Sequence, residues 1–213
     1  MMTSFPTEEL HWWQSPEPTT EELSTSGGLL VEDWPHARQV ERLANKLFSA
    51  TQPLHRLDET QQRLLARAAF LHNAGMLVEV RRHHKHSYRL IKETPLPGFT
   101  EQERHEIACI ARYHRRALPS TLHEEFAQLD QAARKRVSAL SALVRIADAL
   151  DFNHDGRVLH LFTLDEQCNK EIWTIALQVR RLADLDLEME HAYAKADLFE
   201  KAFKHKLRLV VQE

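Results

Sequence analysis

The sequence predicts a mainly α-helical protein with a small α+β appendage at its C-terminal end. The 213 residues include only 5 glycines and 8 prolines, fewer than the tight turns of a β-sandwich require. Apolar residues recur at helical spacing between Asp33 and Leu150. After Asp155-Gly156 the apolar pattern changes to a period of two, which is typical of half-buried strands. We therefore expect a bundle of five or six helices followed by a β-rich segment.

The predicted helices begin at recognisable capping residues. Pro35 suits the first turn of a helix that extends to about Ala50, and Asp58 with Gln61 forms a capping box for the next helix. The other expected elements are a helix over 84–92, a helix after the capping box at 100–103, a minor helix over 122–129, a long helix over 130–150, strands over 158–162 and 173–179, a helix over 192–204 and a strand over 207–211.

Charge is distributed unevenly along the chain. Residues 1–33 contain seven acidic residues and no Lys or Arg, whereas the rest holds all 28 Lys and Arg against the remaining 24 acidic residues. The first segment also lacks a sustained apolar period. We expect an acidic, flexible arm (1–33), a helical domain (34–153) and a β-rich α+β appendage (154–213). The weak positive charge of the body does not favour nucleic acid as a partner.

The overall composition excludes several protein classes. Apolar residues make up 43% and charged residues 28% of the chain, as in globular proteins. Two cysteines, Cys109 and Cys168, cannot form a disulfide framework, which favours the reducing cytoplasm. The N-terminus lacks the cationic start and apolar region of a signal peptide, and no run of about 18 apolar residues exists. We therefore expect neither a secreted scaffold nor a membrane protein.

Four polar side chains occupy apolar helix faces. His36, His72, His114 and Asp148 each fall where helical spacing would place a core residue. A single histidine in such a position is usually a hydrogen-bonded core residue, but four such groups from four helices are better satisfied by one shared centre. Burying an unpaired carboxylate costs several kcal/mol, and buried charges are normally paired or bound to a metal. Such a set of nitrogen and oxygen donors suits Mn, Fe, Ni, Zn or Mg.

The order of these residues resembles the HD-domain superfamily of metal-dependent phosphohydrolases. More narrowly, several segments are similar to the C-terminal HD region of the exopolyphosphatase / guanosine pentaphosphate phosphatase (Ppx/GppA) family. These segments are AFLHNAG (69–75), HHKHSYRLI (83–91), PGFT (97–100), ARYHR (111–115) and RIADALD (145–151). The resemblance covers about residues 34–211.

The resemblance implies an HD-domain helical bundle that hydrolyses a phosphoanhydride or phosphoester. The substrate would be a nucleotide, a (p)ppGpp-like molecule or polyphosphate, and a divalent metal ion would activate a bound water. It implies His72, Asn73 and Asp148 as catalytic residues. The implied metal ligands are His36, His72, Asn73, His86, His114 and Asp148. His83 and His84 are expected to be surface residues.

A basic segment lies between the metal-binding motifs. Residues 81–116 contain nine Lys and Arg against four Glu, and this excess suits either a phosphate-binding wall or a solvated helix surface. The candidates for phosphate binding are Lys85, Arg112, Arg115 and Arg145.

Two departures from the family pattern bear on function. Asn73 stands where the family has the aspartate of its His-Asp pair, and an amide brings no negative charge to a metal. The alternative function is therefore a catalytically impaired HD module that binds phosphate-rich ligands or a partner protein. Longer family members also carry an actin-like phosphatase domain, for which this chain has no room. The resemblance thus leaves a separate actin-like phosphatase subunit and a homodimer as candidate partners.

Overall fold

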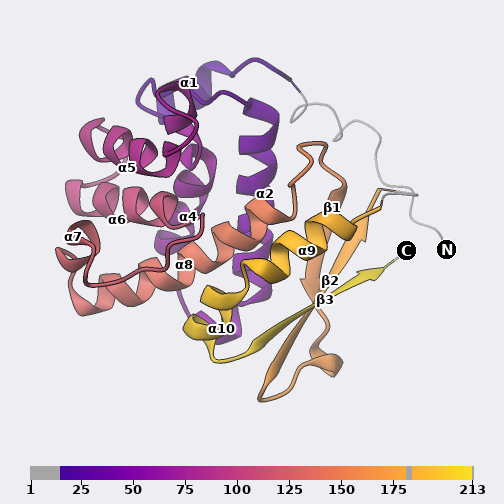
Figure 1. Ribbon diagram of the computed structural model, residues 1–213. Coiled ribbons are helices and arrows are strands. Elements are labelled where there is room, and N and C mark those ends of the chain that lie inside the picture. The colour runs from indigo at the N-terminus through magenta and orange to yellow at the C-terminus, as the bar shows by residue number, and fades with distance from the viewer. Residues whose placement is uncertain (1–14, 181–183, 213) are drawn as a thin grey trace.

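The computed structural model describes residues 15–180 and 184–212 (Figure 1). Its helices are α1 (Thr20–Thr25), α2 (Trp34–Ala50), α3 (Gln52–His55), α4 (Glu59–Leu71), α5 (His83–Glu93), α6 (Glu101–Arg112), α7 (Glu124–Ala127), α8 (Gln131–Ala149), α9 (Asp186–Ala194) and α10 (Asp197–Phe203). The strands are β1 (Val158–Thr163), β2 (Ile172–Val179) and β3 (Lys206–Gln212), and short 3-10 helices are η3 (Ala74–Leu77) and η4 (Asp165–Gln167). This architecture confirms the mainly α prediction with a small α+β appendage.

The four long helices begin at the residues that the sequence singles out. The Asp33 side chain accepts a hydrogen bond from the His36 N–H at 3.0 Å and starts α2. Asp58, Thr100 and Asp130 cap α4, α6 and α8 in the same way. Because each cap satisfies backbone donors that the helix leaves unpaired, it fixes the first turn and thereby the direction of every side chain that follows.

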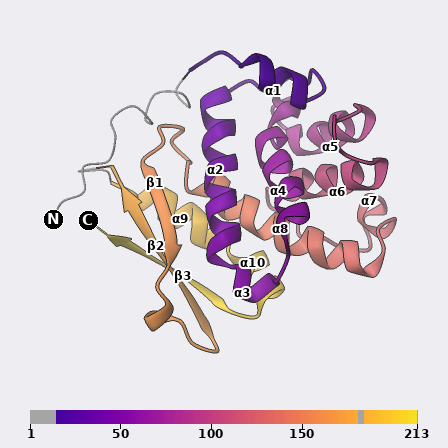
Figure 2. The same ribbon diagram turned by 180° about the vertical axis from the view of Figure 1, so that it is seen from behind.

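Helix α2 lies at the centre of the molecule and joins its two parts. It packs against α4 and α8 on one side and against β1 on the other, as the view from behind shows (Figure 2). The Gln39 side chain donates to the Val158 carbonyl at 2.8 Å, and the Trp173 indole donates to the Ala50 carbonyl at 3.1 Å. One hydrophobic core includes Leu43 of α2 together with residues of the sheet. The C-terminal segment is thus held directly on the helical bundle.

The three strands form one sheet in the order β1-β2-β3. Strand β1 is antiparallel to β2, with Leu161 opposite Leu177, and β2 is parallel to β3, with Ile175 opposite Leu209. A parallel pair needs a long crossover, which α9 and α10 supply. This crossover brings the loop between α9 and α10 against α8, where the candidate site lies.

Part of the segment expected to be an acidic, flexible arm contacts α2. Thr19 and Glu22 form a capping box that starts α1. The buried Arg38 guanidinium then binds Glu22 through two hydrogen bonds of 2.5 and 2.7 Å, and it also binds the carbonyls of Ser15 and Glu17. These contacts hold the segment on α2. Residues 1–14 lie outside the described residues.

The predicted helix over 192–204 is instead two helices. Helix α9 begins earlier, at Asp186, and ends at Ala194, and α10 begins at Asp197. The break at Lys195 is stabilised by the Arg145 side chain, whose Nε donates to the Lys195 carbonyl at 3.2 Å. Because Arg145 is 50 residues from Lys195 in sequence, the local sequence pattern around Lys195 does not predict this bond.

Both cysteines are free thiols. None of the helices in the described part of the chain combines the length and the hydrophobicity that a membrane span requires.

Candidate metal centre

The structure brings His36, His72 and Asp148 together from α2, the end of α4 and α8. One ligand atom of each lies within 4.8 Å of the others. The Oδ1 atom of Asp148 is 3.4 Å from His36 Nε2 and 3.4 Å from His72 Nε2. Neither Nε2 atom has a hydrogen-bond partner, although both are buried. Three of the residues that the sequence places on apolar helix faces therefore meet at one point.

Two hydrogen-bond acceptors, His72 Nε2 and Asp148 Oδ1, face each other. Its Nδ1 is 2.6 Å from the Ala69 carbonyl, so this nitrogen carries the proton and Nε2 presents a lone pair. Burial lowers the pKa of His72, despite the opposing effect of Asp148, and keeps the ring neutral. A lone pair facing the Asp148 carboxylate is unfavourable unless a cation lies between them. The donor set thus fits a divalent ion, with the carbonyl fixing the tautomer as in histidine metal sites.

The His36 ring is held by a second carboxylate. Its Nδ1 lies 2.8 Å from Asp151 Oδ2, and both side chains are buried. Burial alone would lower the pKa of His36, but the nearby carboxylates of Asp148 and Asp151 outweigh it and raise the pKa to about 9. On its outer face the ring stacks on His154 at a centroid distance of 3.7 Å, and His154 in turn binds Asp33. The orientation of His36 is therefore fixed from both sides.

Asn73 is next to His72 in the sequence. It follows His72 directly at the end of α4, and its Oδ1 is buried without a hydrogen-bond partner. A buried amide carbonyl without a partner is costly, and binding to a cation would satisfy it. Asn73 therefore stays a candidate neutral ligand, as the sequence predicts.

His114 lies beside His72 and pairs with His83, which the sequence misassigned to the surface. The rings of His72 and His114 have centroids 4.9 Å apart, and His83 Nε2 is 3.0 Å from His114 Nε2. Both Nδ1 atoms contact carbonyls, those of Val80 and Ala111, so two Nε2 lone pairs face each other. Burial lowers the pKa of both rings, which disfavours a proton between them. The facing Nε2 lone pairs of His83 and His114 therefore also fit a cation.

Gly75 explains why His83 is buried. A Cβ atom at this position would lie 2.2 Å from the His83 carbonyl and 2.4 Å from the Ser87 nitrogen, so only glycine allows η3 to approach α5 this closely. The Gly75 N–H donates to the Ser87 hydroxyl at 2.9 Å, and that hydroxyl donates to the His72 carbonyl at 2.7 Å. The glycine of the LHNAG segment is the signal that could have placed His83 beside the centre.

The remaining sequence candidates lie apart from this cluster or are already engaged. His86 is partly exposed and pairs with Glu79 at 3.2 Å. Arg112 forms an ion pair with Glu125. Arg145 is buried and binds the Lys195 carbonyl and Asp197, so its guanidinium holds the α9–α10 loop and does not face solvent.

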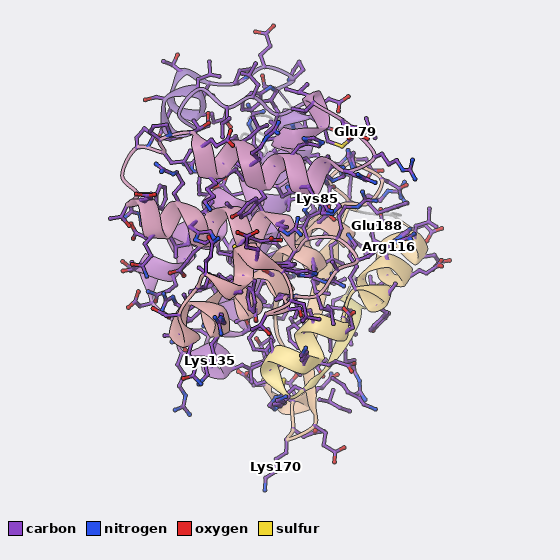
Figure 3. The ribbon with its side chains drawn as sticks, turned by 60° about the vertical axis from the view of Figure 1, so that its left-hand side comes forward. Glu79, Lys85, Arg116, Lys135, Lys170 and Glu188 are labelled. Carbon is purple, nitrogen blue, oxygen red and sulfur yellow. The ribbon has the colours of Figure 1, made fainter. Side chains whose placement is uncertain are left out.

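Lys85 and Arg115 remain available to a ligand. Lys85 is exposed, Arg115 is half-buried, and neither has a partner within the described residues. Arg115 is close enough to His83 to lower its pKa. Figure 3 shows Lys85 and Arg116 on one side of the molecule, whereas Lys135 and Lys170 project from its lower part. Lys85, on α5, and Arg115, after α6, are both close enough to His84 to lower its pKa.

A cavity of about 1020 Å³ lies away from this centre. Its walls come from α3, α8 and α10, and they include Leu54, Lys135 and Phe203 but none of the clustered histidines. The chemistry is concentrated in the buried polar cluster, which makes that cluster the better candidate site.

Comparison with known proteins identifies the family. Residues 29–195 match the model of Ppx/GppA phosphatase, domain III. The chain belongs to the Ppx/GppA phosphatase family. The matched region includes every clustered residue described above and confirms the family that the sequence motifs indicate.

Relatives of this chain include proteins named guanosine-5'-triphosphate,3'-diphosphate pyrophosphatase. The protein from Photobacterium profundum is 29% identical over 161 residues, covering 74% of this chain and 31% of its own length. The protein from Vibrio cholerae is 30% identical over 162 residues, covering 74% and 32%. That from Pseudoalteromonas translucida is 34% identical over 101 residues, covering 47% and 20%. The chain spans about a third or less of the length of these curated relatives.

Proposed function

We propose that this chain is an HD-type, metal-dependent phosphohydrolase that acts on a phosphoanhydride or phosphoester of a nucleotide, a (p)ppGpp-like molecule or polyphosphate. The observation that carries the proposal is the approach of two acceptors to 3.4 Å of each other: the buried His72 Nε2, which has no hydrogen-bond partner, and Asp148 Oδ1. The names of the relatives, which are pyrophosphatases of a guanosine nucleotide, support the substrate class.

In this proposal His36, His72, Asn73 and Asp148 hold one divalent ion, which is Mn, Fe, Ni, Zn or Mg. When bound, such an ion lowers the pKa of a water and polarises a phosphoryl oxygen. The Ala69 carbonyl keeps the proton of His72 on Nδ1, and Asp151 orients His36 in the same way. Because the ligands come from different helices of one core, their geometry is set before substrate arrives.

We assign the contact between His83 and His114 to the proposed binding of the substrate. His114, together with His83 where the sequence had suggested His86, would hold a second ion through the two Nε2 lone pairs. Arg115 and Lys85 supply unpaired positive charge on the same side, which favours the phosphate-binding interpretation of the basic segment over a merely solvated surface.

The first test is metal stoichiometry by elemental mass spectrometry after Mn²⁺ loading and removal of loose ions. We expect one or two equivalents in the wild type and loss of at least one in His72→Ala, with the fold checked by circular dichroism. His86→Ala is the matched control, since His86 lies apart from the cluster, and should keep its metal. Unchanged metal content in His72→Ala would contradict the assignment.

A hydrolysis screen separates the enzyme from the alternative binding module. Metal-loaded protein should release phosphate or pyrophosphate from a guanosine nucleotide or tripolyphosphate, and Asp148→Asn should abolish this release. Stoichiometric metal without turnover of any phosphoanhydride would favour the impaired module. Its Asn73 ligand would then be the reason, because the ion would face less ligand charge.

A further inference from the structure

The break between α9 and α10 directs one lysine into the candidate centre. Lys195 follows the last residue of α9, and its backbone N–H still bonds to the His191 carbonyl at 3.2 Å. Its side chain leaves the helix axis toward α8, where Nζ lies 2.5 Å from Asp148 Oδ2. The Lys195 side chain is about one quarter exposed, so its ammonium lies between the partly buried Asp148 carboxylate and solvent.

Arg145 holds this arrangement in place. It lies three residues before Asp148 on α8, hence on the same helix face. Its Nε donates to the Lys195 carbonyl at 3.2 Å, and its Nη2 donates to Asp197 Oδ1 at 2.7 Å. The guanidinium therefore clamps the end of α9 to the start of α10. Arg145 thus fixes the backbone of Lys195 beside α8, from which the side chain reaches Asp148.

The two oxygens of Asp148 have separate partners. Oδ1 faces His36 and His72, whereas Oδ2 is bound to the Lys195 ammonium. The ammonium is the largest of the favourable influences that hold the pKa of Asp148 well below its ordinary value against burial. An ion at the histidines would thus meet one oxygen of a carboxylate whose charge Lys195 already balances.

We propose that Lys195 is a built-in cation that limits Asp148 to one ligating oxygen and weakens the affinity of this centre for divalent ions. The inference rests on the proposed metal site. Among the proposed ligands, His36, His72 and Asn73 bring no charge. Asp148 brings one negative charge, and Asp151 adds another behind His36. Asp148, Asp151 and Lys195 together carry a net charge of −1, and without Lys195 the two carboxylates carry −2. Lys195 therefore acts as a positioning and affinity-setting residue.

The test is Mn²⁺ affinity measured by isothermal titration calorimetry on the full chain. In Lys195→Met, which keeps the length of the side chain and removes its charge, we expect the dissociation constant to fall about tenfold or more. Even at the dielectric constant of water, the repulsion between a unit positive charge and a divalent ion about 5 Å apart changes the dissociation constant about tenfold. Lys195→Arg should stay within about threefold of the wild type. Lys201→Met, which removes an exposed charge on α10, is the control and should change nothing.

The outcomes separate this inference from the proposed function. Equal or weaker Mn²⁺ binding in Lys195→Met would overturn the role of Lys195. Absence of binding in every variant would remove the metal centre and the inference together. Tight binding in Lys195→Met with no hydrolysis by any variant would refute the proposed function and leave the inference standing. Should Lys195→Met fail to fold, Lys195→Gln, which also removes the ammonium, should lower the dissociation constant about tenfold. An unchanged constant there would count against the proposal.

Discussion

The electrostatics of His36 make a prediction about the metal-free protein. Asp148 and Asp151 raise the pKa of this buried histidine to about 9, from an ordinary value of 6.5, although burial acts in the opposite direction. A difference of that size corresponds to about 3 kcal/mol in favour of the protonated form in the folded state. The protonated His36 should therefore stabilise the fold when no metal is bound.

The direction of the pH dependence follows from the sign of this difference. Because the folded-state pKa lies above the unfolded-state value, the stabilisation is fully present below pH 6.5 and is lost as the pH rises through about 9. Burial lowers the pKa values of His72, His83 and His114, so their protonation affects stability below pH 6.5. The range between pH 6.5 and 9 therefore isolates His36 among these histidines. We expect a loss of about 2–3 kcal/mol across it.

Urea unfolding in the presence of a chelator, followed from pH 6.5 to 9, measures this loss directly. Nuclear magnetic resonance of the His36 ring gives its pKa independently. An ion bound at Nε2 requires the imidazole to lose a proton, so an excess of Mn²⁺ should flatten the profile. A metal-free profile that is flat over this range, or a His36 pKa below about 7, would refute the electrostatic reasoning.

Three further substitutions test other parts of the structure. Glu22→Ala leaves the buried Arg38 without its carboxylate and should lower the free energy of unfolding by about 2–4 kcal/mol in urea denaturation, whereas an effect below 0.5 kcal/mol would show that α1 is not held by this pair. Thr100→Ala removes the cap of α6 and should lower the free energy of unfolding by about 1 kcal/mol, with no change in Mn²⁺ content. Asn73→Asp adds a charged ligand and should raise both metal occupancy and hydrolysis of a nucleotide; no change in either would mean that residue 73 does not limit the site.

The sequence predicts the helices whose causes are local. Asp33, Asp58, Thr100 and Asp130 are capping residues next to apolar stripes, and the structure starts a helix after each of them. The break at Lys195 has no such local cause. It depends on a hydrogen bond from a residue on another helix, and the surrounding residues are good helix formers. Local propensity therefore predicts one continuous helix where long-range bonding produces two.

The same distinction applies to the candidate site. His36, His72 and Asp148 are predictable because each interrupts an apolar stripe, and a polar residue at a core position needs an explanation. His83 is the first residue of α5 and stands among His84 and basic residues, so nothing in its local pattern indicates burial. Its position beside His114 follows from the close approach at η3, which is a property of tertiary packing.

The contact between His72 Nε2 and Asp148 Oδ1 lies next to the contact between the Nε2 atoms of His83 and His114, and in each contact two acceptors face each other. His72 takes part in the first contact through Nε2, and its ring contacts His114, which belongs to the second. A neutral core would place hydrogen-bond donors opposite these lone pairs, as buried polar groups normally require. Lys195 binds the outer oxygen of Asp148, and in the metal-free protein the protonated His36 faces the inner one, but the lone pair of His72 Nε2 faces the same inner oxygen without a donor. The fold thus tolerates unfavourable contacts in its interior that cations would relieve, which is the expected cost of a preformed binding centre and has no advantage for a purely structural core.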